Sequence, residues 1–485
     1  IVYEAPYNQY SQEILNQESN LYKFLPDITF LIIDARSIFG EIFRFPYSIS
    51  NSDREQFVGE KINEIKNLID KFVEKTNSKL VISKLSIPTF SPNGIFESKM
   101  EYSFQNMVED FNHKLTKNYL ISENVFAYDF EKFVTKNGED HIFDYSQFFF
   151  GDLKISMEYL PAFGQELMKY VIAYLGITKK CIVLDLDNTL WGGIIGEDGF
   201  NGIKLGPEPP GNAFMEFQRV LLSLHQRGII LAINSKNNFE DAIKVIKDHP
   251  YMILREEHFS SMRINWADKV TNMKEIIKEL NIGSDSLVFI DDDPVNREFV
   301  KSIFPEILVV NLSNDPSTYV PTIENLIDFS VLKITNEDRN RGKMYLKQKE
   351  INQLQESTPD LQTFLSQLEL KVIIKEVDEF SLPRTSQLIL KTNQFNLTTK
   401  RYQESDIHEM VNDPNFIVGC AQVEDKFGDN GITGVFILKK ENKFEWKIDS
   451  FLMSCRIMGR DIEKCIIAHI INKAQENGIK TVKAD

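Results

Sequence analysis

Cysteine is scarce in this sequence. Four cysteines occur among 485 residues, at positions 181, 420, 455 and 465, and no two of them form a CxxC pair. So few cysteines exclude a disulfide framework and a cysteine-based zinc site, and they are typical of a reducing compartment. We therefore expect the protein to be cytoplasmic.

Long apolar runs are missing as well. The longest runs, such as FLII at 30–33, are far shorter than the roughly 20 residues that a membrane helix needs. No signal peptide opens the sequence. We expect neither membrane insertion nor export.

Positive charge is in deficit. The chain has 55 Lys and Arg residues against 71 Asp and Glu residues, which gives a formal net charge of -16. A charge of this sign repels a nucleic-acid backbone, so nucleic acid is not expected as a partner. Net charge does not exclude a locally basic pocket or an acidic carrier protein as a partner.

The sequence does contain enough apolar residues for several cores. Hydrophobic residues make up 42% and charged residues 26% of the chain, as in a soluble globular protein. The length suggests about three domains. We predict them over residues 1–175, 176–330 and 331–485.

The apolar segments predict an α/β fold for the first two domains. In the first domain, short strands alternate with amphipathic helices, as in β-α-β units. In the second domain the strands are apolar throughout, which indicates a parallel sheet covered by helices on both faces. The predicted strands are ITFLIID, KLVIS and NVFAYDF in the first domain and CIVLD, GIILAIN, SLVFIDD and ILVVNL in the second, where helices are predicted near 211–226, 239–247 and 267–280.

The third domain is predicted to be α+β. After a helical segment at 337–356, three alternating strands follow with GDNG and EN as turns, namely PNFIVGCAQVED, GITGVFILKK and KFEWKIDSFLMS. Strands joined in this way indicate an antiparallel sheet. A final amphipathic helix is predicted to end at Gly478, because glycine is the usual residue after a helix C-terminus.

The segment CIVLDLDNTLWGG, residues 181–193, places two carboxylates at the end of a predicted strand. Ligands of open parallel sheets bind at the carboxyl ends of the strands. Asp185 and Asp187 can face the same mouth, while Thr189 and a pair of glycines permit a tight turn after them. The structural alternative is an Asx turn in which Asp187 caps the next helix.

Three more polar motifs follow in the second domain. LAINSKN places Ser235 after a strand, and NWADKVTNMKEI places Lys269 at a helix start, where a hydroxyl and an ammonium group can hold a phosphoryl group. A helix cap and a solvated surface lysine are the alternatives. SLVFIDDDP ends in Asp291, Asp292 and Asp293, whose mutual repulsion indicates a hard metal ion.

These four motifs, in this order, resemble the haloacid dehalogenase (HAD) superfamily of phosphatases and phosphotransferases. The resemblance implies that Asp185 attacks phosphorus and that Asp187 protonates the leaving oxygen and later activates water. It implies that Ser235 and Lys269 contact the phosphoryl group. It also implies Mg²⁺ as a cofactor, bound by Asp185, Asp187, Asp292 and Asp291.

A longer resemblance points to one branch of this superfamily. The strings VLDLDNTLWGGIIGEDGFNGIKLG, ILREEHFSSMRINWADK and FIDDDPVNRE, with LILKTNQFNLTTKRY and FLMSCRIMGRDIE in the third domain, resemble FkbH-like proteins. The resemblance implies an enzyme that takes a three-carbon unit from D-1,3-bisphosphoglycerate and removes phosphate. Such an enzyme loads a glyceryl group on the phosphopantetheine thiol of an acyl carrier protein for polyketide-type biosynthesis.

The third domain resembles a GNAT-type acyltransferase. In that fold a loop and a helix N-terminus hold the pantetheine phosphates, and Arg456 and Gly459 are candidates for the loop. Asp461 replaces a small neutral residue of the loop motif, which disfavours coenzyme A. Cys455 is the candidate thioester nucleophile, with a small buried hydrophobe as its alternative. Three amides that can bind glycerate or pantetheine, or cap turns, are Asn393, Gln394 and Asn396.

Two residues near the aspartate pair are further candidates for the substrate pocket. Trp191 can shape it and Arg263 can charge it, with buried packing and a surface ion pair as the alternatives. The first domain resembles the SGNH-hydrolase-like extension of some FkbH-like proteins. It lacks a Gly-Asp-Ser block, so we expect a structural or carrier-docking role there.

Three functions follow from these patterns. The first is a Mg²⁺-dependent glyceryl transferase and phosphatase that loads a carrier protein. The second is a plain HAD phosphatase that acts on a small phosphoester. The third is a non-catalytic carrier-docking protein, which the complete set of four motifs argues against.

Overall fold

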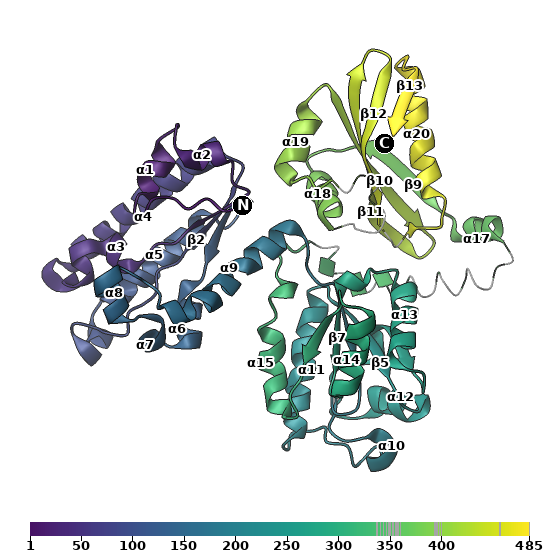
Figure 1. Cartoon of the computed structure of the whole chain (residues 1–485), viewed down its shortest axis with the longest axis horizontal. Helices are drawn as coiled ribbons and strands as arrows, with labels where there is room; N and C mark the ends of the chain where they lie inside the picture. Colours follow the sequence, from purple (N-terminus) through teal and green to yellow (C-terminus); the bar gives the residue numbers. More distant parts are fainter. Residues whose placement is uncertain are drawn as a thin grey trace. The chain divides into compact units, whose positions relative to one another are not determined.

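The computed structural model describes residues 1–335, 360–391, 400–454 and 457–484, with short stretches between 338 and 358 and residues 396 and 398. The chain forms two compact units, Ile1–Val171 and Ile172–Asp485 (Figure 1). The second unit contains two separate sheets. Among the described residues, no helix has the length and apolar character needed to cross a membrane.

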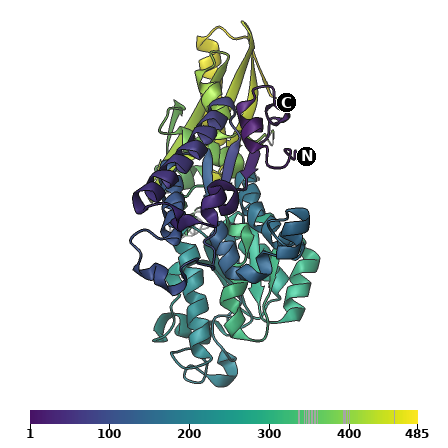
Figure 2. The ribbon, with the colours of Figure 1, turned by 90° about the vertical axis from the view of Figure 1, so that its left-hand side faces the viewer.

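The first unit has the predicted alternation of strands and helices, which forms a parallel sheet with helices on both faces. Its strands are β1 (Ile28–Leu31), β2 (Lys79–Ser83) and β3 (Val125–Tyr128), in the order β1-β2-β3. Alternate side chains of β2 pack into cores on opposite faces of the sheet. On one face, Leu80 and Ile82 pack with α4 (Asn51–Lys75) and α5 (Phe104–Asn118). Val81 packs on the other face with Phe163 of α9 (Leu160–Leu175). Helices of this unit, in purple and blue, lie over the sheet in Figure 2.

The second predicted domain has a five-stranded parallel sheet in the order β6-β5-β4-β7-β8. Its strands are β4 (Cys181–Leu184), β5 (Ile230–Ser235), β6 (Phe259–Ile264), β7 (Leu287–Asp291) and β8 (Leu308–Asn311). Ile182 and Leu184 face one core, and Cys181 and Val183 face the other. The predicted parallel sheet is therefore confirmed, with burial on both faces as the reason for its apolar strands.

Helices connect these strands close to where they are predicted. The three predicted ones are α11 (Gly211–Gln226), α12 (Phe239–Asp248) and α13 (Lys269–Leu280). A further helix, α14 (Pro294–Ile303), was not predicted. Strand β6 was not predicted, because its sequence FSSMRI contains two serines and lacks the apolar run of the other strands. Ser260 and Ser261 are nevertheless buried in the sheet.

The C-terminal sheet has the order β13-β12-β11-β10-β9. Its strands are β9 (Lys371–Glu376), β10 (Phe416–Asp425), β11 (Gly428–Asn442), β12 (Glu445–Met453) and β13 (Thr481–Ala484). Helix α20 (Ile462–Glu476) packs on one face, and α18 (Leu382–Lys391) and α19 (Glu404–Asn412) pack on the other. Another helix, α17 (Leu361–Leu368), precedes β9. The predicted α+β arrangement is thus present.

Two details of the predicted C-terminal sheet are wrong. The segment GDNG lies inside β11, and the turn before it falls at Lys426 and Phe427, because Asp425 already pairs with Gly428. The sheet is also mixed, because β13 pairs with β12 in parallel. The predicted helix at 337–356 lies mostly outside the described residues.

Candidate active site

The polar motifs of the second predicted domain meet at one edge of its sheet. Strand β4 lies between β5 and β7, and Asp185 directly follows β4. Ser235 is the last residue of β5, and Asp291 is the last residue of β7. Because the three strands are parallel neighbours, these side chains come together where parallel sheets bind ligands.

Three carboxylates form a cluster at this edge. Asp185, Asp291 and Asp292 each offer one oxygen, and these oxygens lie within 4.8 Å of one another. Asp291 is fully buried and Asp185 is nearly so. Oxygen ligands of this charge and spacing are what a hard cation such as Mg²⁺ requires, so the residues present fit the predicted ion.

Lys269 supplies the positive charge of the cluster. Its Nζ lies 2.8 Å from Asp185 Oδ1 and 2.9 Å from Asp291 Oδ2, and it donates to the backbone oxygen of Asn234 at 2.8 Å. The side chain is 1% exposed, so the predicted alternative of a solvated surface lysine is wrong. Burial, the largest single influence, lowers the pKa of Lys269, but the combined attraction of both aspartates raises it above its usual value.

Burial and the remaining negative charge of the cluster raise the pKa values of its two other carboxylates, Asp291 and Asp292. Burial raises the pKa of Asp292 to about 6, and the charges of Asp185 and Asp291 add to the effect. The pKa of Asp291 is raised by its burial and by Asp185, against the attraction of Lys269. One lysine therefore does not balance three carboxylates, which again favours a bound cation.

Asp187 lies beside the cluster and is not among its three carboxylates. Its Oδ1 accepts hydrogen bonds from Trp191 Nε1 at 2.8 Å and from the backbone N–H of Ile195 at 3.1 Å. Ile195 begins the short helix α10 (Ile195–Asp198), so Asp187 also serves the helix start that the Asx-turn alternative predicted. Burial raises the pKa of Asp187, against the hydrogen bonds that it accepts. Metal ligation by Asp187 stays a prediction.

Trp191 is a packing residue with one polar contact. The side chain is fully buried in the core of the domain. Its indole N–H donates a hydrogen bond to Asp187 Oδ1. The predicted alternative of buried packing is therefore the one that the structure shows, and a direct substrate contact by Trp191 does not fit its burial.

Ser235 has the place that the sequence predicted and is not a helix cap. It is buried at the end of β5, and its Oγ accepts a hydrogen bond from Asn237 Nδ2 at 3.0 Å. The next helix, α12, begins four residues later with Asn238 as its N-cap. Its proposed contact with a phosphoryl group stays a prediction.

Thr189 and Arg263 differ in their relation to the cluster. Thr189 is fully buried, and its Oγ1 has no hydrogen-bond partner among the described residues, which leaves the hydroxyl free for a ligand. Arg263 instead forms ion pairs with Glu275 at 2.7 Å and Glu279 at 2.9 Å. The ion pairs predicted as the alternative for Arg263 are therefore present, and its role in substrate binding stays a prediction.

Sequence reasoning missed several supporting residues. Asn234 Nδ2 donates to the backbone oxygen of Lys269 at 2.9 Å, which fixes the start of α13. Arg297 Nη1 donates to the backbone oxygens of Asp291 and Asp292 at 2.8 and 2.7 Å. Asn234 lies in LAINSKN and Arg297 follows FIDDDP closely. Their closeness in sequence to these motifs is the feature that could have predicted their supporting role.

The candidates of the third domain are described only in part. Asn393, Gln394, Cys455 and Arg456 lie outside the described residues. Asn396 is buried, pairs with Leu452 of β12 and donates from Nδ2 to the backbone oxygen of Lys400 at 3.4 Å. Gly459, in the loop before α20, has a φ of +77°, a backbone conformation that favours glycine.

Two comparisons concern the first and second predicted domains. Residues 1–172 match the family described as FkbH, N-terminal domain. A solved structure of the N-terminal part of protein BF1531 from Bacteroides fragilis, which contains a phosphatase domain and is complexed with Mg, is 28% identical to the chain. The alignment covers 69% of this chain and 87% of that one, with a TM-score of 0.63. These findings confirm the predicted resemblance to FkbH-like proteins and support a protein of the phosphatase type.

Other comparisons concern the C-terminal sheet. The ribosomal-protein-S18-alanine N-acetyltransferase from Escherichia coli is 10% identical over 24% of this chain and 66% of that one, with a TM-score of 0.20. An IAA acetyltransferase from Bacillus cereus is 17% identical over 24% of this chain and 65% of that one, with a TM-score of 0.18. Likeness at these values carries no inference about activity. No curated protein sequence matches the chain, and the SGNH-like resemblance of the first domain is not confirmed.

Proposed function

We propose that residues 176–330 form a Mg²⁺-dependent phosphatase or phosphotransferase site of the HAD type. The observation that carries the proposal is the cluster of Asp185, Asp291 and Asp292 around Lys269. Burying four charged groups at the end of a sheet costs folding free energy, and sites with such strained charges are often functional. The likeness to a phosphatase domain complexed with Mg supports the same assignment.

Asp185 is the proposed nucleophile. Its carboxylate attacks the phosphorus of the substrate, and the bond from phosphorus to the leaving oxygen breaks. Lys269, which lies 2.8 Å from Asp185, stabilises the negative charge on the phosphoryl group. Bound by Asp185, Asp291 and Asp292, Mg²⁺ would supply further positive charge for the same group.

Asp187 is the proposed general acid and base. Its raised pKa increases the fraction that carries a proton, which it donates to the leaving oxygen. The carboxylate that remains takes a proton from the water that attacks the aspartyl phosphate. Phosphate then leaves and Asp185 is restored. The hydrogen bonds from Trp191 and Ile195 keep the Asp187 carboxyl oriented through both steps.

We further propose that the substrate is D-1,3-bisphosphoglycerate and that residues 331–485 hand its three-carbon unit to a carrier protein in the cytoplasm. The Cys455 thiolate attacks the acyl phosphate carbon, a thioester forms and the phosphate on C1 leaves, while the Asp185 site hydrolyses the phosphate ester on C3, so that the unit handed on is glyceryl. The phosphopantetheine thiol of the acyl carrier protein then displaces Cys455. The match of residues 1–172 to the FkbH N-terminal domain supports this assignment.

A plain phosphatase of a small phosphoester is the second candidate. It needs only the aspartate cluster and Lys269, and it leaves the third domain to recognise substrate. A carrier-docking protein without catalysis would not need a buried lysine held by two aspartates. The three candidate functions therefore differ in whether phosphate is released and in whether the carrier protein is loaded.

Intact mass of the carrier protein separates these candidates. An acyl carrier protein with its phosphopantetheine arm is incubated with the 485-residue chain, Mg²⁺ and enzymatically generated 1,3-bisphosphoglycerate. A glyceryl mass increase on the carrier supports the transferase. Phosphate release without loading supports the plain phosphatase, and neither product supports the docking protein.

The thioester step has its own test. A Cys455→Ala chain is expected to lose carrier loading while phosphate release from a simple phosphoester continues. The matched control is Cys465→Ala, because Cys465 is an exposed cysteine of α20. Undiminished loading by the Cys455→Ala chain would remove this residue from the mechanism.

A further inference from the structure

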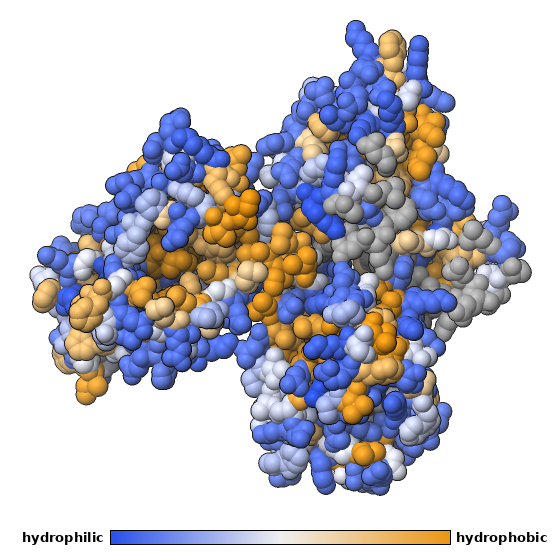
Figure 3. All heavy atoms as spheres, viewed as in Figure 1, coloured by the Kyte–Doolittle hydropathy of each residue, from blue (hydrophilic) through white to orange (hydrophobic). Residues whose placement is uncertain are grey.

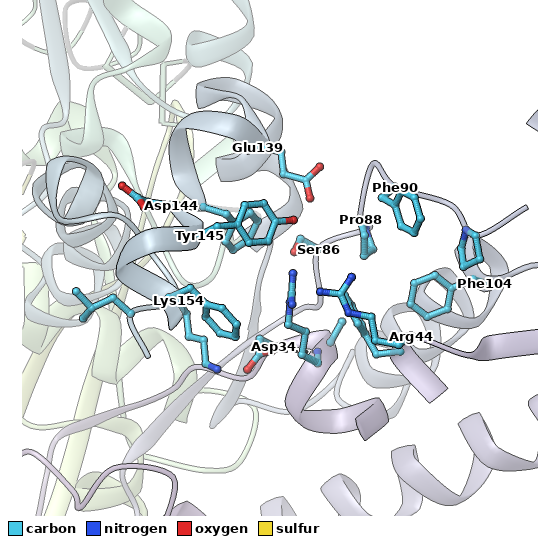
Figure 4. Close-up of a pocket in the computed structure, with 17 residues that line it drawn as sticks. Asp34, Arg44, Ser86, Pro88, Phe90, Phe104, Glu139, Asp144, Tyr145 and Lys154 are labelled. Atoms are coloured by element: carbon cyan, nitrogen blue, oxygen red, sulfur yellow. Dashed lines mark hydrogen bonds between the residues drawn. The ribbon is translucent and has the colours of Figure 1, made fainter. Parts of the chain in front are cut away.

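The first unit contains a hollow that the proposed chemistry does not use. It has a volume of about 870 Å³, including the part open to solvent (Figure 4). Asp34 lines it just after β1, and Ser86 lines it just after β2. The hollow therefore lies at the carboxyl ends of two parallel strands, where open α/β sheets bind their ligands.

The carboxylates that line this hollow are engaged in the fold. Asp34 caps α3 (Ala35–Phe39) by accepting from the backbone N–H groups of its first turn. Asp144 caps α8 (Tyr145–Gly151) by accepting from Gln147 N–H at 3.0 Å. Glu139 accepts from the backbone N–H of Thr89 at 3.0 Å. Each of these carboxylates is held by a backbone donor.

Two arginines of the hollow carry charge without a carboxylate partner. Arg36 and Arg44 both line it, and across the described part of the chain neither forms an ion pair. Both guanidinium groups lie over the ring of Phe43, at 4.9 and 5.6 Å from its centroid. Arg36 also lies 5.0 Å from the ring centroid of Phe148. Two permanent positive charges thus share one aromatic wall.

The residues that line this hollow do not form a hydrolase site. No histidine is among its lining residues, and Ser37 near Asp34 donates its hydroxyl to Asp34 Oδ2 at 2.6 Å. A DxxH sequence does occur at Asp110 and His113, but it lies on α5, and neither residue lines the hollow. The hollow is suited to binding without a serine nucleophile.

We propose that this hollow binds a small organic anion. Arg36 and Arg44 hold its carboxylate or phosphate group, because a guanidinium pairs with either oxyanion through parallel hydrogen bonds. The rings of Phe43, Phe104 and Phe148 contact the apolar or planar body of the molecule. Figure 4 shows Arg44 and Ser86 on one side of the hollow and Tyr145 on the other, with Glu139 at its rim. Figure 3 shows hydrophobic residues at the surface of this unit as well.

Titration calorimetry on the 485-residue chain tests the proposal. Phenylacetate and phenylphosphonate are the two anionic probes, and benzyl alcohol is the neutral probe of similar shape. We expect at least one anion to bind about 10-fold or more tightly than benzyl alcohol, with binding that weakens as salt rises. Preference for phenylacetate assigns a carboxylate ligand, and preference for phenylphosphonate assigns a phosphate ligand.

Arg44→Gln assigns this binding to the hollow. Arg44 is exposed, so the variant folds, and we expect it to lose the preference for the anion. The matched control is Arg219→Gln, which removes an arginine of α11 that pairs with Glu216. Thermal unfolding checks that both variants keep the stability of the parent chain. Equal binding of benzyl alcohol and the anions, or anion binding unchanged in Arg44→Gln, overturns the proposal.

Discussion

At the scale of single residues, the proposed phosphatase reaction depends on the carboxylate of Asp185. We expect Asp185→Asn to lower phosphatase turnover at least about 1,000-fold, because loss of a nucleophile removes the covalent route. The control is Asp293→Asn, since Asp293 directly follows the cluster in sequence but caps α14 through Val295 N–H at 2.8 Å. That control should retain both turnover and stability, because Asn caps a helix N-terminus about as well as Asp. Equal turnover in both variants would contradict the assignment of Asp185.

Lys269 is expected to control stability as well as catalysis. Lys269→Met leaves Asp185 and Asp291 buried without their shared cation, which costs about 3 to 5 kcal/mol when one partner of a buried pair is removed. Chemical denaturation without Mg²⁺ measures the loss. Added Mg²⁺ should recover part of it, because an ion that binds only the folded state stabilises that state.

The control for this change lies on the same helix. Lys274 is exposed on α13, so Lys274→Met should leave both stability and its Mg²⁺ response unchanged. A stability of Lys269→Met equal to that of this control would show that the buried ion pairs do not hold the site together.

At the scale of elements, the start of α13 is what places Lys269. Asp268 caps this helix, with Oδ1 accepting from Thr271 N–H at 2.9 Å and Oδ2 from Thr271 Oγ1 at 2.7 Å. We expect Asp268→Ala to lower both stability and turnover, because the first turn that carries Lys269 loosens. Steady-state kinetics and denaturation measure the two effects.

An equivalent cap elsewhere in the chain provides the control. Asp360 caps α17 through the same two contacts with Thr363, at 2.9 and 2.7 Å. Asp360→Ala should show a similar loss of stability with turnover unchanged. If both variants lowered turnover equally, the effect would reflect general stability and not the placement of Lys269.

Strands were predicted correctly where the side chains on both faces of the sheet are buried. Strand β4 consists of apolar residues alone, and β7 is apolar up to its last residue, Asp291; a local pattern of that kind identifies both strands. Strand β6 failed this test because Ser260 and Ser261 are buried by neighbouring elements, which no local pattern reveals. The parallel pairing of β13 with β12 was missed for a similar reason, because β13 is short and lies after a helix.

At the scale of the whole molecule, two half-buried histidines predict acid sensitivity. Burial lowers the pKa of His225 and of His258 below the ordinary value of 6.5, and their rings lie 5.6 Å apart. The unfolded chain takes up these protons first as the pH falls. The contribution to stability is therefore complete above about pH 6.5 and is lost as pH falls from there toward the folded-state pKa, by up to about 1.4 kcal/mol for each pKa unit of difference.

Thermal unfolding between about pH 8 and pH 5 measures this effect. His225→Gln should reduce the dependence of the unfolding midpoint on pH below 6.5, the ordinary value for histidine. His113→Gln is the control, because His113 is exposed on α5. A pH dependence identical in both variants would show that His225 does not contribute.

The candidate site was predictable wherever the chemistry followed a strand end. Motifs at strand ends predicted Asp185, Ser235 and Asp291, because parallel strands bring their carboxyl ends together whatever the loops between them. Lys269 was predicted from a motif at a helix start. Asn234 and Arg297 were not found, since their role is a contact with the backbone of a residue in another segment. Arg263 showed no local sign of its ion pairs with Glu275 and Glu279 on α13.

The amino-acid sequence alone determined the parallel sheet, the order of its polar motifs and their place at its carboxyl edge, because apolar periodicity and chain direction are local properties. Only the tertiary structure decided that Asp293 caps a helix while Asp291 and Asp292 join Asp185, and that Lys269 is buried between two aspartates. The physical reason is that burial and ion pairing depend on segments distant in sequence. The same holds for the two arginines of the first unit, whose lack of a carboxylate partner no local pattern shows.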